Sequence, residues 1–439
     1  MAQEDVAPIR VGLLGAGTVG SQTARLLVEQ KDELAARIGR PIELTGVACL
    51  DPAETDPFPW IDKAIVTTDT MSVATNSDIV IELIGGTGVA RKFVLAAIES
   101  GASVVTANKA LLAKYGPEIY AAAEAKGVDI YFEASVGGAI PFLKPLRESL
   151  VGDKVTSMLG IVNGTTNYIL DEMTTKGLDF DDVLKDAQAK GYAEADPTFD
   201  IEGTDSAHKL MLLSAIAFGV PVDMTKVHIE GITHLEAKDI KFAEELGYRI
   251  KLLGITKYTD YGIELRVHPA LVPTRRLLAN VEGAMNAVVV KGDAAESSLY
   301  YGKGAGSEPT GSAVVADLID IARTAEVAVS ERPRMPTTTH NPKAKSFADF
   351  GDTVCSYYLR IPVEDKPGVL AEIARILADN KISIESLIQK EAPLEDASTE
   401  IILLTHSTRE ADIQRAIRTM QQLANVRGAI VLLRKEELQ

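Results

Sequence analysis

Short apolar runs alternate with segments of helical spacing along the first third of the chain. The run 9–14 predicts a buried strand, and residues 18–38 carry apolar side chains three and four positions apart, which predicts a helix. The same patterns predict strands at 42–50, 77–86, 103–107 and 130–134, and helices at 91–100 and from 109 onward. Strands that alternate with helices predict an α/β fold with a Rossmann-type, doubly wound parallel sheet.

The pattern changes after about residue 145. A strand at 155–162 precedes helices that run to about 218, and strand-like runs recur at 250–258, 262–269 and 287–291, which together predict an α+β domain. Residues 331–351 are rich in Pro, Thr and charge and predict a linker. The remainder has a βαββαβ order. We therefore predict four parts, with limits at 1–145, 146–330, 331–351 and 352–439.

Composition narrows the classes of partner. The 439 residues include 45 basic and 62 acidic ones, and the net charge of −17 argues against nucleic acid and anionic membranes. Cys49 and Cys355 lie far apart without metal-ligand spacing, which fits a reducing compartment. Neither an export signal nor a membrane-spanning apolar run is visible. We expect a cytoplasmic protein.

A glycine-rich turn, G-A-G-T-V-G, follows the first strand and opens the first helix. Gly15 would make the turn, Gly17 would let the backbone approach a pyrophosphate, and Gly20 would let helix and strand pack closely. With Thr18 and Val19, these residues are the candidate contacts of a dinucleotide, whose phosphates would face the helix amides. The alternative is a glycine turn with no ligand.

The end of the second strand bears on which dinucleotide binds. Asp51 is placed to accept hydrogen bonds from a ribose 2′-hydroxyl and to repel a 2′-phosphate, and no Lys or Arg follows until Lys63. This favours NAD over NADP. The alternative is that Asp51 only begins a turn with Pro52.

The segment 191–209 concentrates five acidic residues, a histidine and a lysine. Asp205 and Lys209 lie four positions apart, and the apolar run 210–216 that follows predicts a buried helix. A buried lysine needs partners and can serve in proton transfer. Glu194 lies on a loop where a carboxylate can hold an ammonium or hydroxyl group. The alternative for Asp205 and Lys209 is an ordinary surface ion pair.

Two further features lie at strand ends. Lys109 follows a strand at its C-terminal end, where ligands bind in open parallel sheets, although it could also be a lysine near the start of a surface helix. The turn 133–141, E-A-S-V-G-G-A-I-P, can direct several carbonyl groups at one cation. A hinge between domains is the plainer interpretation of this turn.

These motifs together resemble the homoserine dehydrogenases over about the first 330 residues. The matching segments are L-G-A-G-T-V-G (14–20), E-L-I-G-G (82–86), T-A-N-K-A-L-L-A (106–113), E-A-S-V-G-G-A-I-P (133–141), N-G-T-T-N-Y-I-L (163–170), G-Y-A-E-A-D-P (191–197), D-I-E-G-T-D-S-A-H-K (200–209) and Y-Y-G-K-G-A-G (300–306). The resemblance implies the NAD(P)-linked reduction of L-aspartate 4-semialdehyde to L-homoserine in threonine and methionine biosynthesis. We expect the single-function form of the enzyme.

The resemblance also implies residue roles. Lys209 matches the proton donor, and Lys109 a residue near substrate and nicotinamide. The remaining matches are substrate contacts at Glu194 and Asp205, with Asp200 as a further candidate, cofactor contacts at Gly191 and Gly306, and a sodium site at Glu133, Val136, Gly138 and Ile140. Relatives usually prefer NADP, but Leu50 stands where many of them carry an arginine suited to a 2′-phosphate, which again leans toward NAD.

The C-terminal part resembles an ACT domain, notably in V-E-D-K-P-G-V-L-A at 363–371. Gly368 opens a helix whose amides could take the carboxylate of an amino acid. Such domains pair, so the resemblance implies a homodimer or homotetramer with threonine as a feedback inhibitor. For this domain, the alternative is a dimerisation module without ligand. For the whole protein, the alternatives are another NAD(P)-dependent dehydrogenase and a non-catalytic amino-acid sensor.

Overall fold

The computed structural model describes residues 7–327, 331–332, 346–389 and 398–437. The centre of the predicted linker, 333–345, lies outside these residues. The chain divides into two compact units, each built from three segments. Unit 1 contains Met1–Thr156, Ala207–Thr225 and Asn286–Ala344, and unit 2 contains Ser157–Ser206, Lys226–Met285 and Lys345–Gln439. The four predicted domain limits stay a prediction.

A six-stranded parallel sheet forms the centre of unit 1. Its order is β3-β2-β1-β4-β5-β6, which is the strand order of a dinucleotide-binding Rossmann fold. The strands are β1 (Ile9–Leu14), β2 (Ile42–Ala48), β3 (Val66–Thr67), β4 (Ile79–Glu82), β5 (Ser103–Thr106) and β6 (Ile130–Tyr131). The predicted Rossmann-type sheet is therefore confirmed.

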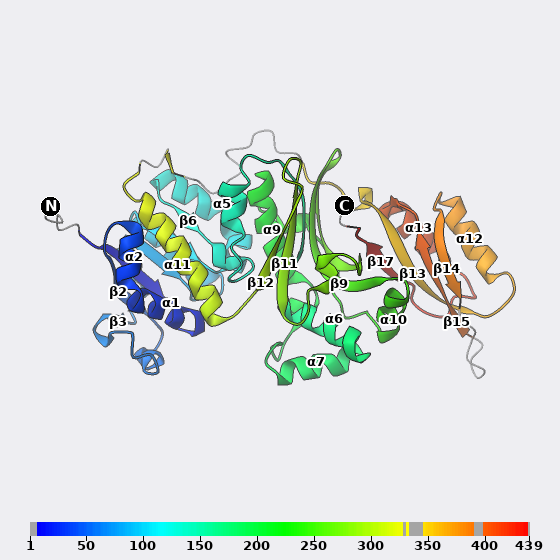
Figure 1. The fold of residues 1–439 in the computed structure, drawn as a ribbon, viewed down its shortest axis with the longest axis horizontal. Helices are drawn as coiled ribbons and strands as arrows, with labels where there is room; N and C mark the ends of the chain where they lie inside the picture. Colours follow the sequence, from blue (N-terminus) through cyan, green and yellow to red (C-terminus); the bar gives the residue numbers. More distant parts are fainter. Residues whose placement is uncertain (1–6, 328–330, 333–345, 390–397, 438–439) are drawn as a thin grey trace. The chain divides into compact units, whose positions relative to one another are not determined.

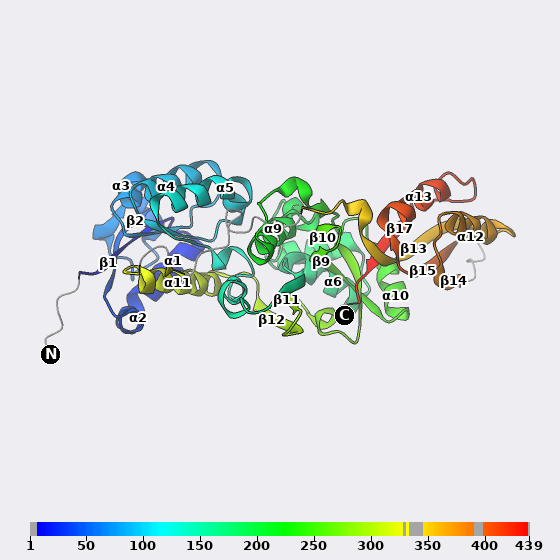
Figure 2. The ribbon, with the colours of Figure 1, turned by 90° about the horizontal axis from the view of Figure 1, so that it is seen from above.

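Helices cover both faces of this sheet. Figure 2 shows α3 (Thr70–Thr75), α4 (Gly88–Glu99) and α5 (Lys109–Lys126) on one face, and α1 (Thr18–Glu29), α2 (Lys31–Ile38) and α11 (Ser307–Thr324) on the other. The single helix predicted over 18–38 is wrong, because the structure ends α1 at Glu29 and starts α2 after Gln30.

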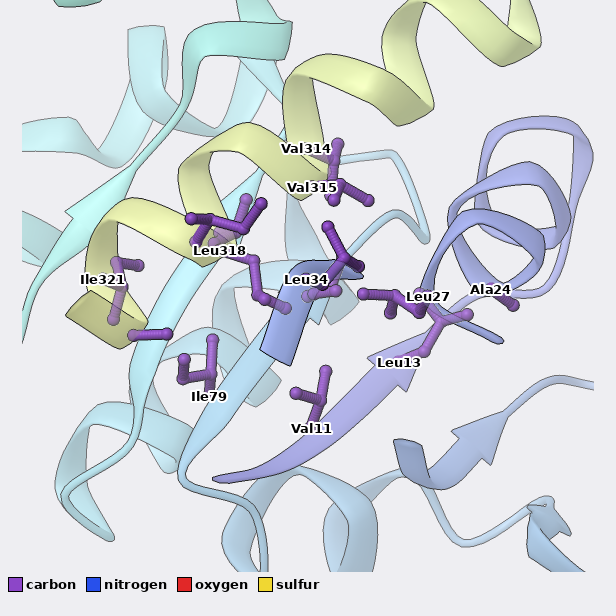
Figure 3. Close-up of a cluster of buried hydrophobic side chains, with 14 of the residues drawn as sticks. Val11, Leu13, Ala24, Leu27, Leu34, Ile79, Val314, Val315, Leu318 and Ile321 are labelled. Atoms are coloured by element: carbon purple, nitrogen blue, oxygen red, sulfur yellow. The ribbon is translucent and has the colours of Figure 1, made fainter. Parts of the chain in front are cut away.

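The helix α11 comes from late in the chain yet completes the core of the N-terminal sheet. Figure 1 shows it in yellow beside the blue helices α1 and α2. Val314, Leu318 and Ile321 of α11 belong to the same buried cluster as Leu13 of β1 and Leu27 of α1 (Figure 3). Unit 1 also holds the neighbouring strands β11 (Met285–Gly292) and β12 (Ser297–Lys303).

In unit 2, a run of paired strands has the order β7-β9-β10-β17-β13-β15-β14, and β8 pairs separately with β10. The strands are β7 (Val155–Ile161), β8 (His228–Ile229), β9 (Tyr248–Thr259), β10 (Gly262–Pro273), β13 (Val354–Glu364), β14 (Ile384–Gln389), β15 (Ser398–Thr405) and β17 (Val431–Lys435). The helices are α6 (Gly164–Lys176), α7 (Phe180–Ala189), α8 (Thr198–Ile201), α10 (Ala237–Glu245), α12 (Val369–Asp379) and α13 (Glu410–Met420). Helix α9 (Thr204–Phe218) begins at the end of a unit 2 segment and continues in unit 1.

The predicted βαββαβ domain is confirmed as the antiparallel sheet β17-β13-β15-β14 with α12 and α13 packed on its apolar face. Its edge strand β17 runs parallel to β10, with Ala270 opposite Arg434 and Leu271 opposite Lys435. The C-terminal sheet therefore continues directly into the sheet of the preceding part of unit 2.

Three fully buried arginines fix this junction. Arg266 of β10 donates to Glu436, Arg360 of β13 to Asp239, and Arg434 of β17 to Glu410, at 2.6–2.8 Å. We call these three the junction arginines. Buried charges require such paired, hydrogen-bonded arrangements.

Among the described residues, no helix is both long and apolar enough to cross a membrane.

Candidate active site

The glycine-rich turn at the end of β1 is shaped by backbone packing. Gly15 has a φ of +98°, which favours glycine, and a Cβ on Gly20 would lie 1.9 Å from the Gly15 carbonyl oxygen. A Cβ on Gly17 would meet nothing within 4 Å. Gly17 is the N-cap of α1 and provides no side-chain cap for the amides that follow, such as those of Thr18 and Val19. This arrangement fits a dinucleotide pyrophosphate.

A buried carboxylate ties the next two strand ends together. Glu82, at the end of β4, accepts from Ile84 N at 2.9 Å and from Thr106 Oγ1, at the end of β5, at 2.7 Å. Thr106 Oγ1 in turn accepts from Asn108 N, and Asn108 caps α5, which starts at Lys109. Burial raises the pKa of Glu82. Residue-level prediction missed Glu82, although it begins the quoted E-L-I-G-G motif.

The structure bears on both interpretations of Asp51, as a ribose contact and as the start of a turn with Pro52. Its Oδ1 accepts from Ala53 N at 2.9 Å, so the turn with Pro52 does form, and the side chain remains exposed beyond β2. Leu50 beside it is 92% exposed. Lys63, the nearest following base, is bonded to Asp56 at 3.2 Å.

The side chain of Glu133 stabilises the turn 133–141 itself. Its carboxylate accepts from the backbone N–H groups of Phe142, Leu143 and Lys144 at 2.5–2.8 Å, and its own N–H donates to Asp317 at 2.7 Å. Burial raises the pKa of Glu133 and, together with the Glu133 charge, that of Asp317. A cation at this turn would therefore be held by backbone carbonyl groups.

Gly138 of the turn packs against the middle of the 300–306 motif. Gly138 has a φ of +57°, and a Cβ there would lie 2.7 Å from the Gly304 carbonyl group. Gly304 contacts Asn286, which is 1% exposed and has no hydrogen-bond partner for either amide atom within the described ranges. The Asn286 amide, beside this turn, could therefore contact a polar ligand or an ion. The described residues contain no cluster of His, Cys, Asp and Glu side chains suited to a metal ion.

Two predicted carboxylates of unit 2 come together around Asn163. The Asn163 amide donates to Asp200 Oδ1 at 2.7 Å and to Asp205 Oδ2 at 2.8 Å. Its Oδ1 accepts from Thr166 N at 2.8 Å, which caps α6. All strong bonding positions of this amide are thus used. Asn163 was not among the predicted site residues, although it begins the quoted N-G-T-T-N motif.

The loop that follows α7 carries the remaining unit 2 candidates. Gly191 follows the C-cap of α7 with a φ of +76°. Tyr192 stacks on Tyr168 of α6, with ring centroids 4.5 Å apart, and this contact holds the start of the loop against α6. Glu194 is exposed, and its carbonyl oxygen accepts from Gln188 Nε2 at 3.1 Å. The fixed backbone and exposed carboxylate suit contact with a polar ligand.

Helix α9 carries both Asp205 and Lys209, one turn apart. Their side chains are 3% and 8% exposed, and Leu210 to Leu213 are buried as well. An ordinary surface ion pair would be solvated, so this pair differs from the plainer alternative. Gly306 begins α11 in unit 1 with a φ of +124° and no side-chain cap.

Three family models match successive parts of the chain. The model of the NAD-binding domain of homoserine dehydrogenase matches residues 15–133, the homoserine dehydrogenase model matches 141–319, and the ACT domain model matches 357–425.

Full-length relatives extend this result. The chain is 49% identical to a homoserine dehydrogenase of Neisseria gonorrhoeae, over 98% of this chain and 99% of the relative. It is 48% identical to that of Pseudomonas aeruginosa, with the same coverage. The crystal structure of a homoserine dehydrogenase from Thiobacillus denitrificans is similar with a TM-score of 0.94 and 50% identity, covering 99% of both chains.

Proposed function

The chain belongs to the homoserine dehydrogenase family, and on this premise we propose which of its residues carry out the reduction of L-aspartate 4-semialdehyde to L-homoserine. It is an oxidoreductase acting on a CH–OH group, with a nicotinamide-dinucleotide-binding domain and an ACT domain. The observation that carries the assignment of roles is the buried Asp205 and Lys209 on α9, with Asp205 bonded to the same amide as Asp200.

Lys209 is the general acid in this proposal. A nicotinamide cofactor held at the glycine-rich turn of Gly15, Gly17 and Gly20 would supply hydride for the carbonyl carbon of the semialdehyde. As charge develops on the carbonyl oxygen, the Lys209 ammonium donates a proton to it, and Lys109 contributes positive potential. Glu194, Asp200 and Asp205 hold the ammonium and polar groups of the substrate, which lowers the barrier mainly through orientation.

The reverse reaction requires the opposite state of Lys209. A neutral amine must accept the proton of the homoserine hydroxyl, and an oxidised nicotinamide would take the hydride from the carbon that bears this hydroxyl.

NAD is the proposed preferred cofactor. The exposed Asp51 carboxylate and the apolar Leu50 offer no cation to a 2′-phosphate, and Lys63 is already bonded to Asp56. Replacing Leu50 with arginine should raise kcat/KM for NADP over NAD by about tenfold, the size of one charge-assisted contact. An unchanged ratio would contradict the proposal.

We also propose a sodium site formed by the carbonyl groups of Glu133, Val136, Gly138 and Ile140. The backbone bonding of the Glu133 carboxylate and the orphaned Asn286 amide support it. Sodium chloride should raise the melting temperature more than equal concentrations of choline chloride, and Asn286→Leu should reduce that difference. Equal stabilisation by both salts would rule out a specific site.

For the ACT domain, we propose pairing into a homodimer or homotetramer, threonine inhibition and a cytoplasmic setting. Helix α12 begins at Gly368, with a φ of +97° and no side-chain cap, so its first amides are available to a carboxylate. Light scattering measures the assembly, and a threonine titration of the initial rate measures the inhibition.

One assay tests the catalytic proposal against its alternatives. Purified protein is mixed with homoserine and either NAD or NADP, and reduced nicotinamide is followed by absorbance. Activity with homoserine but not with aspartate supports the proposal. Activity with aspartate alone would favour another dehydrogenase, and no activity with either would favour an amino-acid sensor.

A further inference from the structure

Glu82 ends the strand at which the order of the unit 1 sheet reverses. Strands β2 and β3 lie on one side of β1, whereas β4, β5 and β6 lie on the other. In open parallel sheets, ligands bind beyond the carboxyl ends of the strands at such a point. Glu82 pairs with Leu14 of β1 and with Thr106 of β5, and its side chain is fully buried. The carboxylate therefore lies at the edge of the sheet where a dinucleotide is expected to bind.

The loop after β4 exposes its backbone beside the glycine-rich turn. Gly85 and Gly86 have φ values of +78° and +68°, and a Cβ on either would meet nothing within 4 Å. Ile84, before them, is 37% exposed. The start of the loop contacts the turn after β1, since a Cβ on Gly15 would lie 2.7 Å from the Leu83 carbonyl oxygen. The segment 83–86 is thus an open surface next to the proposed pyrophosphate site.

Both oxygens of the Glu82 carboxylate accept hydrogen bonds. One accepts from the backbone N–H groups of Ile84 and Gly85, at 2.9 and 3.3 Å, and the other accepts from the Thr106 hydroxyl, at 2.7 Å. A side-chain amide could not replace this group, because it would direct N–H donors at one of the two sides. No basic side chain of the described residues forms an ion pair with Glu82. Burying a carboxylate without a cation is costly, and such groups concentrate at functional sites.

The Thr106 hydroxyl connects Glu82 to the start of α5. It accepts from Asn108 N at 2.9 Å, and the Asn108 side chain donates to the Gly86 carbonyl oxygen at 2.7 Å. Asn108 is the N-cap residue of α5, and the half-buried Lys109 is the first residue of this helix. Together with the backbone of the loop after β4, these bonds form a closed ring. The ring therefore fixes that loop and the first turn of α5 relative to each other.

We propose that Glu82 is a positioning residue for the reduction and that it acts on Lys109 through Thr106 and Asn108. It keeps the Lys109 ammonium and the loop 84–86 in the arrangement that the reacting groups require, without contacting substrate or cofactor itself. The inference rests on the proposed function, because Lys109 has a role only within it. The absence of a cationic partner distinguishes Glu82 from the junction carboxylates, whose buried guanidinium partners cancel their charge.

Two substitutions break the ring at different points. Glu82→Gln nearly preserves the volume but presents donors on one side, and Thr106→Val removes only the hydroxyl. Each should lower kcat for semialdehyde reduction by roughly tenfold to a hundredfold, the cost of misplacing a reacting group by about 1 Å. The Kd of the reduced dinucleotide should change little, because the turn after β1 is unaltered. Thr106→Ser keeps the hydroxyl and should retain kcat.

Ser103→Ala is the matched control. Ser103 begins the same strand, is buried, and its hydroxyl accepts from Asp129 N at 3.1 Å. This change therefore also removes a buried hydroxyl that binds a backbone N–H group, but at the amino end of β5, away from the ring. It should lower the melting temperature without lowering kcat.

Calorimetric titration with the reduced dinucleotide counts the molecules of each variant that fold and bind, and kcat is expressed per such molecule. A purely structural role would reduce this count but leave kcat per competent molecule unchanged. Near-normal kcat in Glu82→Gln or in Thr106→Val would overturn the inference, as would an equal loss in Thr106→Ser or in Ser103→Ala. The unaltered protein is assayed first. Its inactivity would remove the proposed function and this inference together, whereas the outcomes in the variants remove the inference alone.

Discussion

Two groups of carboxylates in unit 2 are held by different kinds of donor. Asp200 and Asp205 share the neutral amide of Asn163. At the junction with the C-terminal domain, by contrast, Glu436, Asp239 and Glu410 each accept from a buried guanidinium. An amide fixes geometry without adding charge, whereas a guanidinium also cancels the charge of its partner. The shared amide therefore orients the first two carboxylates, and the guanidinium partners of the second group contribute to structural stability.

The largest effect is expected from replacing Lys209, the cation on the same helix as Asp205. Lys209→Ala should lower kcat about a thousandfold, within the usual range for loss of a general acid. Lys185→Ala, on the exposed face of α7, is the control and should leave kcat unchanged. A folded Lys209→Ala protein with near-normal turnover would refute the assigned role.

The structural side is tested by breaking a junction pair. Arg434→Met leaves the buried Glu410 and the partly buried Glu230 without their guanidinium and should lower the free energy of unfolding by about 3–5 kcal/mol. Denaturant titration measures the change. Arg37→Met removes an exposed i,i+4 pair with Glu33 and should cost less than about 0.5 kcal/mol. Equal losses would show that the junction pairs contribute no more than surface pairs.

Acid should weaken the junction selectively. Burial alone would raise the pKa of Glu436, but the charges of Arg266 and Lys257 lower it from 4.5 to about 2. A lowered pKa in the folded state stabilises the protein fully above pH 4.5, and this contribution disappears as the pH falls toward 2. It amounts to about 3 kcal/mol. Unfolding free energies measured across this range should vary less in Glu436→Gln, and identical slopes would contradict the assignment.

The smallest expected effect separates the two functions of Asn163. Serine also caps helices well but cannot bridge two carboxylates, so Asn163→Ser should change stability by less than about 1 kcal/mol. Loss of the bridge should raise KM for the semialdehyde about tenfold with a smaller change in kcat, the scale of a hydrogen bond to a charged group. Should KM stay constant while stability falls, Asn163 would be a capping residue only.

Much of the architecture was predictable because local patterns determine it. The alternation around β1 and β4 and the βαββαβ order at the C-terminus both appear in the structure. The break at Gln30 was missed because the apolar spacing continues through it. The helix α11 and strand β12 were also not predicted. Placing α11 requires knowing that Leu318 and Leu13 belong to one buried cluster, which no local pattern encodes.

The site shows the same division. Motifs predicted Asp205, Lys209 and the glycine turn as site residues because the chemistry inferred for them depends on short spacing, and their roles stay predictions. Asn163 and Glu82 were overlooked as individual residues, because they bond to partners 24 or more positions away in the chain, such as Asp205 and Thr106. The junction arginines were likewise invisible, because Arg266 and Glu436 are separated by 170 positions.

The late arrival of α11 has a consequence for biosynthesis. A nascent chain that has left the ribosome only as far as β6 displays the apolar surface that Val314 and Leu318 will later cover. The six-stranded sheet of unit 1 therefore remains incompletely covered while the intervening segments are translated. Cellular chaperones that recognise exposed aliphatic side chains have this interval in which to act.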